Sequence, residues 1–62
     1  MTSDVKLALR PNEAARALGV GRDKLFALLA AGAIKSFREG NTRLIPVKAI
    51  EEYLAKRLEE DA

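Results

Sequence analysis

The sequence predicts a mainly α-helical fold that carries one small β-hairpin. Residues 11–32 contain two apolar patterns at helical spacing, separated by a glycine-bearing turn at 19–21. Residues 33–46 form a candidate hairpin around a turn at 39–41, and residues 47–60 carry a third apolar pattern at helical spacing. A helix, a tight turn, a second helix, a two-stranded wing and a closing helix, in this order, predict a winged helix-turn-helix.

The first helix is expected over about 11–18. Residues 5–9 alternate between apolar and other side chains, which suits a very short strand or an extended lead-in. Pro11 fits the first helical position, where its missing N–H costs nothing, and Arg10 is then a poor N-cap. Gly19 can adopt the left-handed conformation that ends a helix, so we expect the helix to stop at the residue before it.

The second helix is expected over about 22–31, with Gly21 as its N-cap and Gly32 at its end. Its inner face consists of Leu25, Leu28 and Leu29. Its outer face and the borders of that face consist of Arg22, Asp23, Lys24, Phe26, Ala27 and Ala30. Exposed alanines serve a helix as good helix formers and also allow close approach to a groove floor, so they do not decide the function.

The wing is expected over about 33–46, with strands at 34–38 and 42–45. Its polar and basic residues are Lys35, Arg38, Asn41, Thr42 and Arg43. Pro46 cannot donate to a strand ladder, so we expect it to close the second strand and lead into a helix over about 47–60. The apolar residues of that helix form one stripe that we expect to face the core: Val47, Ile50, Tyr53, Leu54 and Leu58.

The length and composition predict one domain, 1–62, without a cofactor or metal. Chains of this size bury only roughly 60% of the surface they expose when unfolded, so the core is thin. The 62 residues include no cysteine and no histidine, which removes disulfides, the usual metal ligands and the usual general base, and we expect no enzymatic activity. No apolar run approaches the roughly 20 residues of a membrane span, and the start lacks a signal peptide pattern, so a cytoplasmic location is expected.

The charge is distributed unevenly along the chain. The net charge is +2, but residues 1–48 hold nine Lys or Arg and four Asp or Glu, whereas residues 49–62 hold two and five. A basic body followed by an acidic helix suits a polyanion bound on one face. A solvated charged surface explains the total equally well, and only the segregation favours the polyanion.

Several short motifs follow one another at a characteristic spacing over about 9–54. They are Glu13-Ala14-Ala15, Leu18-Gly19-Val20, Leu25-Phe26, Gly32 with Ile34, Arg38 with Gly40, and Ile45-Pro46 followed by Ile50 and Tyr53-Leu54. In this order the sequence resembles the small phage excisionases and the MerR-like DNA-binding domains of excisionase type.

The resemblance implies that the second helix reads the DNA major groove and that the wing contacts the backbone or the minor groove. The helix residues implied to contact DNA are Arg22, Asp23, Lys24, Ala27 and Phe26, the last near a thymine methyl group; the wing residues are Arg38, Asn41, Thr42 and Arg43, with Lys35 beside them. Arg22 is the expected specific contact, because a guanidinium can bind guanine O6 and N7 together for about 1–3 kcal/mol of discrimination. Lys24 could instead meet a phosphate, and Asp23 could simply stabilise the helix N-terminus.

Three functions remain open from the sequence. The first is an excisionase, or recombination directionality factor, that binds and bends double-stranded attachment-site DNA and directs an integrase towards excision, with further copies of itself along the DNA. The chain ends soon after the closing helix, which we expect to leave no room for the dimerisation helix of a MerR-type regulator. The alternatives are a small transcriptional regulator and a protein-interaction module whose basic face is incidental.

Overall fold

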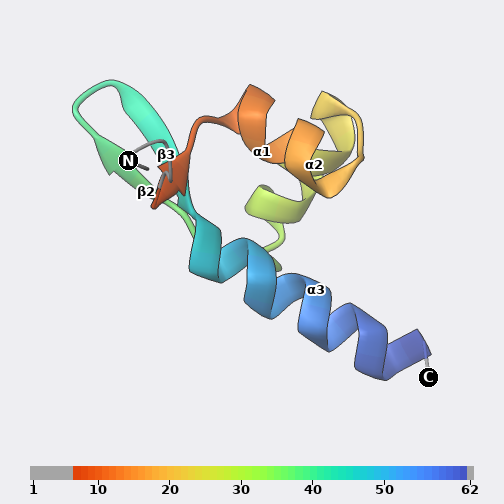
Figure 1. Ribbon diagram of the computed structural model, residues 1–62. Coiled ribbons are helices and arrows are strands. Elements are labelled where there is room, and N and C mark those ends of the chain that lie inside the picture. Colours follow the sequence, from red (N-terminus) through yellow and green to blue (C-terminus); the bar gives the residue numbers. More distant parts are fainter. Residues whose placement is uncertain (1–6, 62) are drawn as a thin grey trace, which may run out of the picture.

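The computed structural model describes residues 7–61, which form three helices and a small antiparallel sheet (Figure 1). The elements are β1 (Ala8–Leu9), α1 (Pro11–Leu18), α2 (Arg22–Ala30), β2 (Phe37–Glu39), β3 (Thr42–Pro46) and α3 (Val47–Asp61). The predicted fold class, mainly helical with a β-hairpin, is confirmed. The predicted start of the lead-in strand, Val5, lies outside the described residues.

α1 begins at Pro11, as the sequence indicates, although its N-cap lacks a side-chain acceptor. Arg10 adopts the extended conformation of an N-cap residue, with φ −77° and ψ 162°. Its backbone N–H donates to Oε1 of Glu13 over 3.1 Å, which is one half of a capping box. An arginine side chain has no acceptor to return that bond, so Glu13 stabilises this helix start from inside the first turn.

α1 and α2 end in the same way, at a glycine in the left-handed conformation. Gly19 and Gly32 both have φ of +77°. The N–H of the residue after each glycine bonds over 3.0 Å to the carbonyl five residues back, which is the long bond of a Schellman motif. α2 itself stops at Ala30, one residue before the predicted end, because Ala31 and Gly32 already belong to this closing turn.

The sheet has three strands in the order β1-β3-β2, not two. Leu9 of β1 lies opposite Ile45 of β3, and Ala8 lies opposite Pro46, so β3 extends one residue beyond its predicted end. β2 is shorter than the predicted strand at 34–38. The side chain of Ile34 is buried in the core, and the pairing of β2 with β3 begins only at Phe37.

The core lies where α1, α2, the sheet and the first turns of α3 meet. Its buried side chains are Ala14, Ala15, Leu25, Ile34, Ile45, Ala49 and Ile50. Leu28 and Leu29 of α2 and Tyr53 of α3 pack against this cluster and are half-buried. The two alanines of α1 allow α2 and β3 to approach closely, so a short chain can still enclose Leu25 completely.

The second half of α3 projects beyond the rest of the molecule (Figure 1). The prediction that Leu54 and Leu58 face the core is therefore wrong, since 42% and 73% of their surfaces are exposed. The helical stripe is real, but the core is too small to cover its distal end. Within residues 7–61 no helix has both the length and the apolar character required to cross a membrane.

Candidate nucleic-acid interface

α2 presents a mixed charged and apolar face to solvent, beginning at its first turn. Its N-cap, Gly21, carries no side chain over the helix start. Arg22 and Asp23 are exposed, and so are Ala27 and Ala30 further along the helix. A helix with small side chains at the centre of its outer face can approach the floor of a groove closely. The major groove of B-DNA, about 12 Å wide, admits an α-helix.

Arg22 and Phe26 form a cation–π pair one helical turn apart. Cζ of Arg22 lies 5.5 Å from the centroid of the Phe26 ring, within the range of a cation–π interaction. Phe26 is 40% exposed, so part of its ring is accessible to a ligand. The pair restrains the Arg22 guanidinium over one side of α2 before any ligand arrives.

Lys24 lies on the other flank of α2, away from that pair. It lines a hollow of about 350 Å³ together with Leu28 of α2 and Tyr53, Lys56 and Arg57 of α3. The structure thus brings Lys24 to two cations of α3, which the sequence did not indicate. One of these, Arg57, bonds to Glu60 over 3.2 Å, and this pair reduces the positive charge of the hollow.

The wing places two predicted residues directly opposite each other. Arg38 of β2 and Arg43 of β3 are cross-strand partners, so their side chains lie on one face of the hairpin. Like charges in this position destabilise a hairpin, and an anion bound between them relieves the repulsion. The turn that joins the strands contains Gly40, with φ of +64°, and the exposed Asn41.

Arg43 is held in place by a residue that the sequence did not single out. Its Nη1 donates to Oγ of Ser36 over 2.7 Å, and both side chains are half-buried. Ser36 lies two residues before Arg38, so the register of the hairpin makes it the diagonal neighbour of Arg43 on the same face, within reach of a long side chain. Thr42 is half-buried, whereas Lys35 is exposed in the segment before β2 rather than within a strand.

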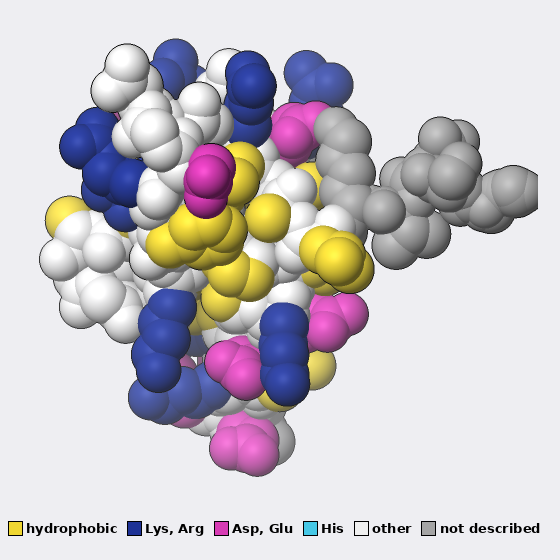
Figure 2. Space-filling model, turned by 90° about the vertical axis from the view of Figure 1, so that its left-hand side faces the viewer, with side chains coloured by type: hydrophobic (Ala, Val, Ile, Leu, Met, Phe, Trp, Pro, Cys, Tyr) yellow, Lys and Arg dark blue, Asp and Glu magenta, His cyan; other side chains and the backbone are white. Residues whose placement is uncertain are grey.

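α2 and the wing meet at a further hollow, of about 200 Å³. It is lined by Phe26, Leu29 and Ala30 of α2 and by Arg43 of β3. On the wing side of the molecule, Lys and Arg side chains surround an apolar area, with Asp and Glu interspersed (Figure 2). The two predicted contact elements therefore border one common surface.

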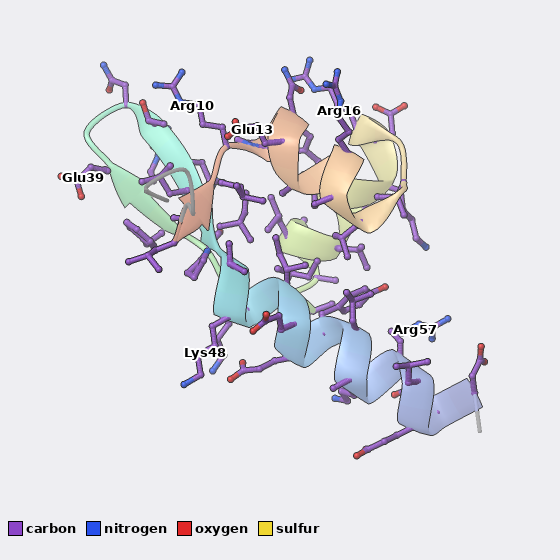
Figure 3. All side chains as sticks on the ribbon, viewed as in Figure 1. Arg10, Glu13, Arg16, Glu39, Lys48 and Arg57 are labelled. Carbon is purple, nitrogen blue, oxygen red and sulfur yellow. The ribbon has the colours of Figure 1, made fainter. Side chains whose placement is uncertain are left out.

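Other cations point elsewhere. Arg10 and Arg16 point away from α3, whereas Lys48 projects from the opposite side of the molecule (Figure 3). Within residues 7–61 no three acidic, His or Cys side chains are grouped closely enough to hold a metal ion. The third hollow, of about 480 Å³ beside α1, is lined by residues that include Leu9 and Arg16, and it lies apart from α2 and the wing.

Comparison with known proteins gives one family match and one curated relative. Residues 8–58 match the family model described as a helix-turn-helix domain. The chain is 47% identical over 51 residues to a "Probable excisionase" of Saccharopolyspora erythraea. That alignment covers 82% of this chain and 52% of the relative, so the chain spans about half the length of the curated relative it matches. No solved structure matches the chain.

Proposed function

Because the chain belongs to the helix-turn-helix domain family, in its excisionase type, we propose that it binds and bends attachment-site DNA and directs an integrase towards excision. On this proposal α2 enters the major groove and the wing contacts the adjacent backbone. The protein contributes binding and DNA shape, and the integrase performs the strand chemistry.

One observation carries the DNA-binding part of the proposal. Arg43 of the wing and Phe26 and Ala30 of α2 line the same hollow, so a ligand that meets one element meets the other. Arg38 stands opposite Arg43, which concentrates positive charge beside the outer face of α2. A double helix offers a groove for α2 and a line of phosphates for the wing at the same time.

The acidic closing helix supports the same orientation. Residues 49–62 hold five Asp or Glu against two Lys or Arg, so phosphates repel most of this segment. A single small module buries only about 600–1,000 Å² on DNA, which limits the specificity of one copy. We therefore propose that several copies occupy neighbouring sites at the attachment region, where their combined contacts stabilise a bend.

The electrostatic part is tested by measuring affinity for duplex DNA at several salt concentrations. Five cations lie on α2 and the wing: Arg22, Lys24, Lys35, Arg38 and Arg43. If they neutralise about five phosphates, log K falls against log salt with a slope of about −4 to −5. Arg43→Ala should reduce this slope by about 0.9, whereas Lys48→Ala, which removes the same charge from α3, outside α2 and the wing, should leave it unchanged. Binding that does not respond to salt would contradict the interface.

The recombination part needs two further measurements. Footprinting on the attachment region of a candidate partner integrase identifies the sites, and circularly permuted duplexes report the bend. Integrase assays with and without the protein then show whether excision depends on it. Specific binding that leaves excision unchanged would favour a small transcriptional regulator, and absence of duplex binding would favour a protein-interaction module.

A further inference from the structure

We propose that the hollow between α2 and the wing is a subsite for one thymidine nucleotide of the bound strand. The 5-methyl group of the base packs on Phe26, Leu29 and Ala30, and the phosphate on the 5′ side of the same nucleotide binds Arg43. This inference rests on the proposed DNA binding and specifies what this part of the surface reads.

The chemistry of the hollow differs between its two sides. α2 contributes apolar side chains only, and β3 contributes the cationic Arg43, in a space of about 200 Å³. The ligand that fits both sides carries a small apolar group close to an anion. Among the four bases, thymine alone presents a methyl group in the major groove. That methyl group lies on the edge of the base nearest its own strand, beside the 5′ phosphate.

Ser36 positions Arg43 for the phosphate. The 2.7 Å bond to Ser36 Oγ uses one of the five N–H donors of Arg43, so the guanidinium is oriented while its other donors can still meet phosphate oxygens. Arg38, on the same face of the hairpin, adds a second positive charge next to that phosphate. Ser36 is thus a positioning residue, and Arg43 is the residue that contacts DNA.

The pair of Arg22 and Phe26 places the subsite relative to the rest of the sequence read by α2. A guanidinium that binds guanine O6 and N7 lies in the plane of that base. The centroid of the Phe26 ring lies only 5.5 Å from Cζ of Arg22, so the hollow that Phe26 lines is close to the base that Arg22 binds. The thymine is therefore expected at the base-pair step next to the guanine bound by Arg22.

Base analogues test the methyl contact without altering the protein. In the footprinted duplex, each thymine is replaced in turn by deoxyuridine, which differs only by the methyl group. One position beside the contacted guanine should lose about fourfold in affinity, the factor that corresponds to about 0.8 kcal/mol for one buried methyl-sized group. At that position 5-methylcytosine should bind more tightly than cytosine.

Two phenylalanine variants assign the effect to the hollow. Phe26→Ala should remove the discrimination between thymine and uracil. Phe37→Ala alters an equally exposed ring, 44% against 40%, that lies outside the hollow, and it should keep the discrimination. Loss of discrimination in both variants, or in neither, would overturn the assignment.

A neutral methylphosphonate on the 5′ side of the same thymidine tests the wing contact. Removing this charge should weaken binding of the wild type by about tenfold or more, because it removes a hydrogen bond between charged groups. Arg43→Ala should be insensitive to the replacement, and Ser36→Ala should be partly sensitive. A purely structural role of Ser36 would lower affinity for both duplexes equally and leave their ratio unchanged, which would overturn its positioning role.

Equal affinity for thymine and uracil at every position, with salt-dependent binding intact, would overturn the subsite and leave the proposed DNA binding standing. Absence of duplex binding would contradict both.

Discussion

Truncating Leu25 tests how the core supports α2. This side chain is fully buried, with 0% of its surface exposed, and it lies between Lys24 and Phe26 on the helix proposed to enter the groove. Leu25→Ala removes the buried side-chain atoms and leaves a cavity, which costs about 2–5 kcal/mol in well-packed cores. A chain of 62 residues has a total stability of about 3–9 kcal/mol, so this one change brings the protein close to its unfolding midpoint.

Leu58→Ala is the matched control, because it is the same chemical change on a side chain that is 73% exposed. About a quarter of this side chain is buried, and scaling the roughly 1.5–3 kcal/mol of full leucine burial by that fraction gives a loss below about 0.8 kcal/mol. Urea unfolding followed by circular dichroism measures both variants, and an unchanged slope against urea shows that the two-state comparison is valid. Comparable losses in the two variants would refute the position of the core and the projection of α3 beyond it.

Three further predictions concern recognition, helix ends and assembly. Arg22→Ala should weaken binding to cognate DNA by about 1–3 kcal/mol more than binding to random DNA. Arg43→Ala should weaken binding to both about equally. Competition assays measure the two affinities, and the reverse pattern would mean that helix and wing are assigned wrongly. Gly19→Ala should lower the free energy of unfolding by about 1–2 kcal/mol because φ there is +77°, although the added methyl group meets no atom within 4 Å. Gly21→Ser should raise it by a few tenths up to about 1 kcal/mol, because serine is a better N-cap. Thermal unfolding that ranks the two variants otherwise would contradict the helix ends. The free protein should sediment as a monomer and fill duplexes with several phased sites cooperatively, and a tight dimer on one palindromic site would favour the regulator instead.

The local features of this fold could be predicted from the sequence. Gly19 and Gly32 adopt the left-handed conformation just after the ends of α1 and α2, and glycine adopts that conformation at little cost. Leu25 follows from the 3.6-residue spacing of apolar side chains, which shows which face of α2 turns inward. Both properties depend on neighbours within one or two turns. The family resemblance likewise rests on short motifs, and the family match over residues 8–58 confirms it.

The extent of each surface was decided by tertiary structure. The stripe that ends in Leu54 and Leu58 continues along α3, but helical spacing does not reveal that the core covers only its first turns. The capping bond of Glu13 to Arg10 is local and was within reach of the sequence, since a glutamate three residues after an N-cap is a known signal.

The candidate site also combines features that the sequence shows with features that only the packing decides. The cations of α2 and the wing are visible in the sequence, but their grouping depends on packing between distant segments. Ser36 and Arg43 meet because the register of β2 and β3 places them diagonally on one face of the hairpin. The place of Lys24 beside α3 follows from the orientation in which α2 buries Leu25. Helical spacing and turn residues thus determined the elements and their inner faces. Only the packing of those elements around a small core decided which exposed side chains lie together, because such contacts join residues that share no local pattern.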